Sequence, residues 1–227
     1  MPAIVTVEQA RAILGPDVLG PREVEQVFGA SAVVPPIPFS RDDLTAAAAA
    51  GEMLVWRVAQ AAGTPLTILE MVRRFPSAFD QKLLRQMGYE LKEDWGIERE
   101  PLAARDTCTP AWALAGKDVL EESRNLSYEE QDETIRKRAA ALRVPVTVLR
   151  RRSAVEAVYD TVLYLVARNA RLLENTWDWT ASRTNDSGYI NVGGCGASGM
   201  QILSFSRGIR HAGLGVCPTR QSGRRER

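Results

Sequence analysis

The side chains that could support nucleophilic catalysis gather near the end of the 227-residue chain. His211 is its only histidine, so a Ser-His-Asp or Cys-His site would have to use it. Cys195, Cys217, Ser204 and Ser206 are candidate nucleophiles by residue type alone, and no G-x-S-x-G motif is present. A small enzyme that combines His211 with a tail cysteine or serine is therefore an alternative, and we expect a binding function instead.

Metal and phosphate sites have little support in the sequence. Three cysteines and His211 could hold zinc only if Cys108 lay close to the tail, and no C-x-x-C pair supports this. The glycine-rich stretch 193–199, GGCGASG, fits neither a P-loop nor a dinucleotide-binding fingerprint. A strand pattern follows it, so we predict a turn or bulge. We expect no metal and no cofactor.

A cluster of basic residues over 136–152 is the second feature with chemical potential. Its members are Arg136, Lys137, Arg138, Arg143, Arg150, Arg151 and Arg152, with no acidic residue among them. Acidic residues precede it from Glu121 to Glu133, which is typical of a solvated helix whose charges match its dipole. Binding of a polyanion or nucleic acid by the arginines is the alternative.

The loops of the tail are the third feature. Residues 176–220 combine polar turns with short apolar runs, and loops on a rigid scaffold often carry binding residues. The candidate contacts are Arg183, Asn185, Asp186, Arg207, Arg210 and His211. Trp177 and Trp179 lie two apart, on one face of a predicted strand. We expect them to pack against the helix predicted at 155–173, and an aromatic binding platform is the alternative.

These residues need elements to position them, and the helix signals are the clearest. Helices are predicted to begin after Thr6, Gly20, Ser40, Thr67 and Ser127, where capping residues or proline precede apolar spacing. The strongest pattern spans Ser153 to Glu174. It predicts one central helix, with Val158, Val162 and Val166 buried.

Strand signals are sparser. Residues 52–60, EMLVWRVAQ, predict a buried strand, and 88–97 and 111–120 predict two more. In the tail, alternation and turn residues predict three or four antiparallel strands after the central helix, the last within 212–220.

The tail resembles the closing strands of C-type-lectin-like domains. Trp179 to Ser182 match a W-[ST]-[SA]-S element, and Gly213 to Val216 with Arg220 match a final G-[FL]-x-[VL]-x-x-x-R strand. The likeness is to the formylglycine-generating-enzyme-like branch and to the variable proteins of diversity-generating retroelements. The tail also resembles a group of bacterial and phage-associated proteins. The likeness implies a binding fold, because the close-spaced cysteine pair of the enzyme branch is missing.

Composition restricts the remaining choices. Hydrophobic residues make up 45% and charged residues 25% of the chain, with a net charge of +1, which gives no overall attraction to nucleic acid or anionic membrane. No signal peptide and no membrane-spanning run is expected, so we expect a cytoplasmic protein with free thiols.

The sequence thus predicts an α+β fold. Residues 1–150 are expected to form a mixed helix and strand region, 151–220 a core helix with antiparallel strands, and 221–227 a polar tail. The expected function is non-enzymatic binding of a protein or small ligand through the loops of the tail, away from membranes.

Overall fold

The computed structural model describes residues 4–31, 33–81 and 95–221, and it shows an α+β fold. A five-stranded sheet has the order β1-β2-β5-β11-β6. Its strands are β1 (Val18–Leu19), β2 (Glu52–Arg57), β5 (Ala111–Gly116), β11 (Pro218–Gln221) and β6 (Leu149–Arg151). β1 runs parallel to β2, and the other neighbours are antiparallel. All six residues of β2 are buried, which confirms the predicted strand.

The tail forms most of a second, four-stranded sheet with the order β10-β7-β8-β9. Its strands are β10 (Leu214–Gly215), β7 (Trp177–Arg183), β8 (Tyr189–Gly196) and β9 (Gly199–Phe205). The predicted antiparallel pairing holds for β7, β8 and β9, whereas β10 runs parallel to β7. The glycine-rich stretch closes the turn between β8 and β9 with a shift in register, as predicted. A small hairpin joins β3 (Gln60–Ala61) to β4 (Thr64–Pro65).

The last predicted strand divides between the two sheets. Residues 212–220 were expected to form one strand, yet Leu214–Gly215 pair with β7 and Pro218–Gln221 enter the larger sheet between β5 and β6. The backbone N–H of Cys217 donates to Asp178 Oδ1 at 2.8 Å, which holds the chain where it passes from one sheet to the other. The larger sheet therefore combines strands from both sides of residue 150.

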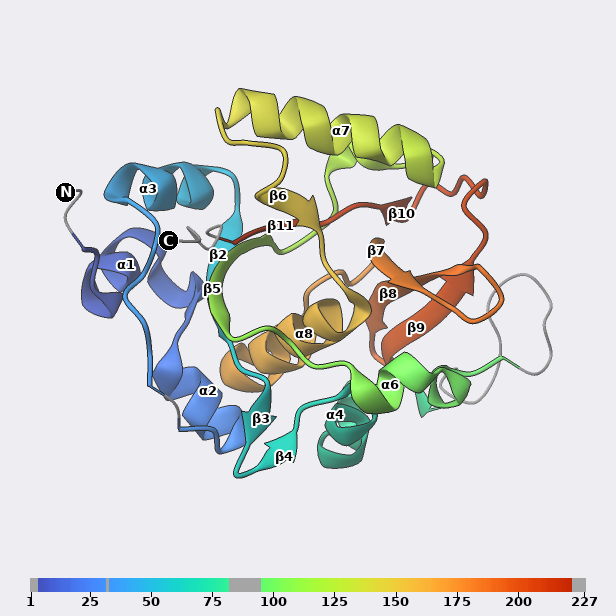
Figure 1. The fold of residues 1–227 in the computed structure, drawn as a ribbon, viewed down its shortest axis with the longest axis horizontal. Helices are drawn as coiled ribbons and strands as arrows, with labels where there is room; N and C mark the ends of the chain where they lie inside the picture. The colour runs from blue at the N-terminus through green and yellow to red at the C-terminus, as the bar shows by residue number, and fades with distance from the viewer. Residues whose placement is uncertain (1–3, 32, 82–94, 222–227) are drawn as a thin grey trace.

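Helix α8 (Ala154–Arg168) lies between the two sheets and packs on strands of each (Figure 1). The prediction of one helix to Glu174 was wrong, because Asn169 adopts the left-handed conformation and ends α8. Val158 and Val162 are fully buried as predicted. Val166 is 46% exposed, against the prediction. Each four-residue step rotates about 40° around a helix, so this row of valines drifts away from the core.

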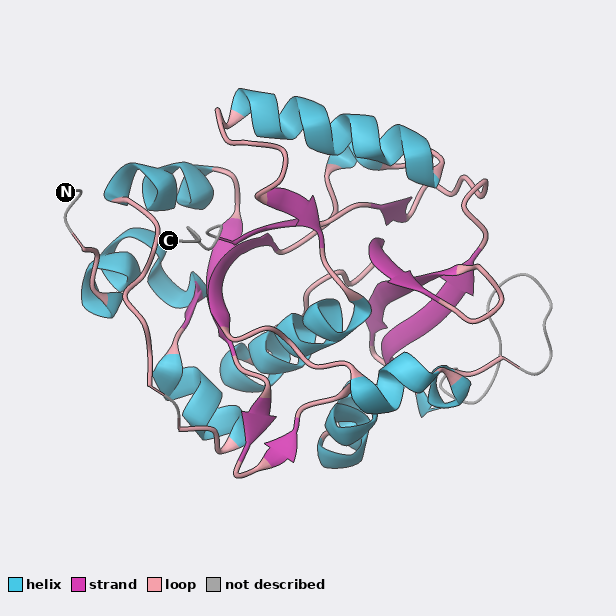
Figure 2. Cartoon of the chain, viewed as in Figure 1, coloured by secondary structure: helices cyan, strands magenta, loops and turns pink. Residues whose placement is uncertain are grey.

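Shorter helices surround the sheets (Figure 2). They are α1 (Val7–Leu14), α2 (Pro21–Phe28), α3 (Arg41–Ala49), α4 (Ile68–Arg74), α6 (Pro101–Arg105) and α7 (Tyr128–Ala141), with 3-10 turns at Gly15–Asp17, Pro76–Ala78, Ile97–Arg99 and Glu121–Ser123. The predicted caps Thr6, Ser40, Thr67, Ser127 and Ser153 all accept hydrogen bonds from the backbone N–H three residues on. The strand predicted at 88–97 falls mostly outside the described residues. Among those described, no helix has the length and apolar character needed to cross a membrane.

A buried ionic network joins α8 to both sheets. Asp160 of α8 accepts two hydrogen bonds from Arg57 of β2, at 2.9 and 2.6 Å, and one from Arg152 at 3.2 Å. Arg152 also donates to Asp178 of β7 at 2.9 Å. The side chains of these four residues are wholly buried. A buried charge without its partner is costly, so the network fixes how the helix and sheets fit together.

Candidate recognition site

The edge of the smaller sheet brings two tail loops together. β8 runs antiparallel to both β7 and β9, so β7 and β9 end at the same edge. The loop at 184–188 follows β7, and a connection at 206–213, here called the crossover, follows β9. The crossover then returns to β10, which pairs beside the start of β7. All six predicted contact residues lie at the end of β7 or in these two segments, and all are exposed.

Four arginine and tyrosine side chains contact one another at this edge and are here called the Arg–Tyr cluster: Arg151, Tyr128, Tyr189 and Arg183. The rings of Tyr128 and Tyr189 stack with centroids 4.0 Å apart. The guanidinium carbon of Arg151 lies 3.7 Å from the centre of the Tyr128 ring, and that of Arg183 lies 5.3 Å from the Tyr189 ring. These are distances at which a cation is attracted to an aromatic face.

Backbone hydrogen bonds hold the cluster in place. Arg151 donates to the carbonyl oxygens of Tyr128 and Trp179 at 2.7 and 2.9 Å. The N–H of Tyr128 donates to the carbonyl of Arg207 at 3.0 Å, and its hydroxyl donates to the carbonyl of Thr180 at 3.3 Å. Burial raises the pKa of Tyr128 to about 12, so its phenol stays neutral near pH 7. The aromatic part of the edge is therefore prearranged.

Trp177 and Trp179 pack beneath the Arg–Tyr cluster. The prediction that they pack against the helix at 155–173 was wrong. Trp179 is fully buried in a cluster with Leu203, Phe205 and Leu214. Its ring meets Tyr128 of α7 edge-on, with centroids 5.3 Å apart. Asp178, between the two tryptophans, is the residue that reaches Arg152 beneath α8. The tryptophans thus pack under α7 and the crossover because strand alternation turns them away from α8.

Hydrogen bonds hold the loop at 184–188 in one backbone conformation. Asp186 Oδ1 accepts hydrogen bonds from the Thr184 hydroxyl, at 2.5 Å, and from the N–H of Gly188, at 3.4 Å. The N–H of Asn185 donates to Glu100 Oε2 at 3.0 Å, at the start of α6. The exposed side chains of Asn185 and Asp186 thus extend from a loop with a defined backbone.

The crossover rests on the first turn of α7. Arg207 lies 3.4 Å from Glu129, and Arg210 lies 2.7 Å from Glu130. His211 is set against the Trp177 ring near the start of β7, with centroids 5.9 Å apart, and its Nδ1 accepts from the N–H of Gly213 at 3.0 Å. His211 therefore belongs to the opposite end of β7 from Arg183.

The thiols have environments that oppose nucleophilic chemistry. All three cysteines are buried and free. Burial raises the pKa of Cys195 to about 12 and that of Cys217 well above its usual range. The Cys217 thiol donates to the carbonyl of Gly116 at 3.1 Å. Reactive cysteines need the opposite, which is partial exposure and a lowered pKa. In the described part of the chain, no three His, Cys, Asp or Glu side chains are arranged to hold a metal ion.

Two of the three arginines at 150–152 are buried, and the third, Arg150, is 41% exposed. Arg152 is fully buried with Asp160 and Asp178, and Arg151 is 5% exposed and binds Asp132. Arg150 makes two hydrogen bonds to Glu156, at 2.8 and 2.7 Å. Ion pairs within the protein therefore occupy the three arginines that were candidates for a polyanion.

Sequence reasoning missed the two tyrosines. Tyr128 is the first residue of α7, directly after the Ser127 cap, and Tyr189 follows the turn at 185–188. An aromatic residue beside a cap or a turn was the available signal, but their stacking depends on the fold. No protein-family model matches the chain, and no curated protein or solved structure matches it either.

Proposed function

We propose that this chain is a non-enzymatic binding protein that recognises a protein partner through the edge formed by the loop at 184–188 and the crossover. The observation that carries the proposal is the Arg–Tyr cluster. Arginine and tyrosine are enriched among the few residues that dominate binding energy at protein interfaces. Arg183 is exposed and Tyr189 is half-buried, so both are available at the surface.

The rigidity of the cluster supports the same proposal. Binding costs free energy for every side chain that must be immobilised, at about 0.5–1.5 kcal/mol each. Tyr128 and Arg151 are already held by backbone carbonyls, and Tyr189 is stacked on Tyr128. A partner would therefore meet an aromatic surface that is largely ordered in advance. The resemblance of the tail to C-type-lectin-like domains agrees with a binding role.

The proposal is tested by affinity capture from the native host, with the full chain as bait and quantitative mass spectrometry as readout. Arg183→Ala and Tyr189→Ala are expected to reduce recovery of the specific partner at least about tenfold, as loss of a dominant interface residue does. Tyr189→Phe keeps the ring and is expected to retain the partner.

The matched control is Arg105→Ala, which removes an arginine whose side chain is 74% exposed on α6, outside the cluster. It should leave recovery unchanged. Surface changes such as Arg183→Ala usually alter stability by no more than ~0.5 kcal/mol, so the melting temperature of that variant should barely change. Equal recovery by the wild type, Arg183→Ala and Tyr189→Ala would place binding elsewhere on the molecule.

A further inference from the structure

A small cavity lies where α8 meets the turn between β8 and β9. It offers about 20 Å³ to a water-sized molecule. Thr161 and Leu165 of α8 line it, together with Cys195 of β8 and Met200 of β9. Thr161, Cys195 and Met200 are between 1% and 4% exposed, so the cavity lies inside the molecule. None of these residues belongs to the Arg–Tyr cluster.

The hydroxyl of Thr161 gives the cavity a chemical preference. A threonine hydroxyl in a helix often donates to the carbonyl four residues earlier, as Thr45 of α3 does to Arg41 at 2.9 Å. The Thr161 Oγ1 atom is buried, yet it has no hydrogen-bond partner in the described part of the chain. A buried hydroxyl without a partner is unfavourable, so a molecule that exchanges a hydrogen bond with it would be stabilised there.

The size and the lining of the cavity select water as its occupant. A buried water needs about 10–15 Å³ and two to four polar partners. Besides Thr161, the Cys195 thiol and the exposed residues Ser77 and Arg171 line the cavity and supply polar groups. Burial raises the pKa of Cys195 to about 12, so it remains a neutral thiol near pH 7. A small cation would meet the charge of Arg171 with no acidic residue in the lining, among those described, to offset it.

The glycine-rich stretch at 193–199 helps to close this cavity. Gly199 also lines it and has a φ of +105°, in the region that favours glycine. A side chain at Gly199 would collide with the backbone of Phe79. The chain that follows the 3-10 turn at Pro76–Ala78 therefore lies directly against β9, where the N–H of Asp80 donates to the carbonyl of Met200 at 2.9 Å. The turn at 193–199 thus forms one wall of the cavity.

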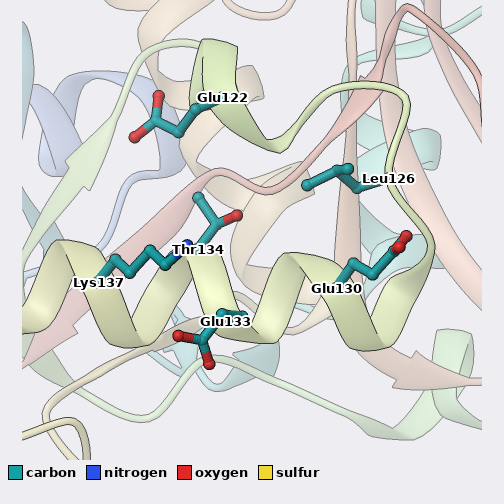
Figure 3. Close-up of a pocket in the computed structure, with 6 residues that line it drawn as sticks. All are labelled: Glu122, Leu126, Glu130, Glu133, Thr134 and Lys137. Atoms are coloured by element: carbon teal, nitrogen blue, oxygen red, sulfur yellow. The ribbon is translucent and has the colours of Figure 1, made fainter.

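A larger groove, with a volume of about 440 Å³, lies between α7 and the turn that precedes it (Figure 3). Its acidic side chains are paired within the protein, because Arg210 binds Glu130 at 2.7 Å and Arg136 binds Glu133 at 2.8 Å. Among the described residues, no side chain that lines the groove has a buried polar atom without a partner. The groove therefore lacks the unsatisfied group that distinguishes the small cavity.

We propose that the small cavity binds a single water molecule, which exchanges hydrogen bonds with the Thr161 hydroxyl and with polar groups of the elements packed on α8. The water is then an internal part of the fold that joins α8 to the smaller sheet. The proposal uses none of the residues of the recognition edge. Variants of Arg183 and Tyr189 leave the cavity unchanged, so the two proposals can fail independently.

Crystal structures at a resolution that shows ordered solvent test the site directly. The wild type should hold one water within hydrogen-bond distance of Thr161 Oγ1, and Thr161→Ser should hold it too, because it keeps the hydroxyl. Thr161→Val should lose it, because the side chain keeps its shape and lacks the hydroxyl. A wild-type cavity without ordered solvent, or a water that stays in place in Thr161→Val, would overturn the proposal.

Urea unfolding gives a second test, since the sign of the effect differs between a hydrated and a dry cavity. With the water bound, Thr161→Val should lower the folding equilibrium constant about threefold to tenfold, because a hydrogen bond is lost. In a dry cavity the same change removes an unsatisfied hydroxyl and should raise that constant. The matched control is Thr45→Val, the same change at an exposed helical position, which should alter the constant by no more than about twofold. A loss in Thr161→Val that does not exceed the loss in the control contradicts the proposal.

Discussion

At the scale of single residues, buried charged side chains connect separate elements of this fold, and Glu156 is an example. Glu156, near the start of α8, is 3% exposed and accepts hydrogen bonds from Arg57 at 2.9 Å and from Arg150 at 2.8 and 2.7 Å. Burial alone would raise its pKa, but Arg57, Arg150 and the Ser153 N–H outweigh that effect. They lower the pKa of Glu156 to about 2.

This lowered pKa predicts how the free energy of unfolding depends on pH. In the unfolded chain Glu156 takes up a proton near its ordinary pKa, whereas in the folded chain it stays ionised down to about pH 2. The stabilisation is therefore complete above the ordinary pKa and is lost as the pH falls to about 2. It corresponds to about 3 kcal/mol. Glu156→Gln should lower the free energy of unfolding at pH 7 by about that amount, because it removes the charge while Arg57 keeps Asp160 and Arg150 keeps Gln221 as hydrogen-bond partners.

Urea unfolding of the wild type and Glu156→Gln between pH 7 and pH 2 measures this effect. The difference in free energy of unfolding should shrink as both proteins approach pH 2. The control is Glu25→Gln, at an exposed position of α2, which should follow the wild type at every pH. A difference that stays constant across this range would show that Glu156 acts by packing and not by charge.

At the scale of elements, local signals located most helix starts, but they did not identify the end of α8 or the partners of the strands. Thr6, Ser127 and Ser153 cap helices in the chain segments where capping boxes predicted them, because a cap is satisfied within four residues. The pairing of β11 depends on β5 and β6, which lie far away in sequence. The same limit applies to the site: the exposed loop residues were predictable, but the stacking of Tyr128 on Tyr189 was not.

Helix α8 offers a matched test of burial on one element. Val162 is fully buried between the sheets, whereas Val166 lies one turn later and is 46% exposed. Val162→Asp should unfold the protein or cost several kcal/mol, because it buries a charge without a partner. Val166→Asp places the same charge near water and should cost far less. Thermal melts by circular dichroism separate the two, and a Val162→Asp protein that melts like the wild type would contradict the central position of α8.

At the scale of the whole molecule, the two sheets depend on each other. β11, near the C-terminus, completes the larger sheet between β5 and β6, and the crossing chain is held by Asp178 of the smaller sheet. Asp160 of α8 accepts hydrogen bonds from both Arg57 of β2 and Arg152. Arg152 also donates a hydrogen bond to Asp178 of the smaller sheet. Separating the sheets would expose buried arginines and carboxylates, and withdrawing β11 would take an interior strand from the larger sheet. We therefore predict a single cooperative unfolding transition for the full chain.

Tryptophans placed in each sheet allow this prediction to be tested. Trp56 and Trp112 report on the larger sheet, and Trp177 and Trp179 on the smaller one. One variant replaces the first pair and Trp95 by phenylalanine, and a second replaces the other pair and Trp95, which lies in neither sheet. Within each variant, urea midpoints from fluorescence and from circular dichroism should coincide. A fragment of residues 1–150 should remain unfolded, because it lacks β11 and α8 and ends within β6. Separate midpoints, or a folded fragment, would mean that the larger sheet forms without the C-terminal strand and that the two halves are independent domains.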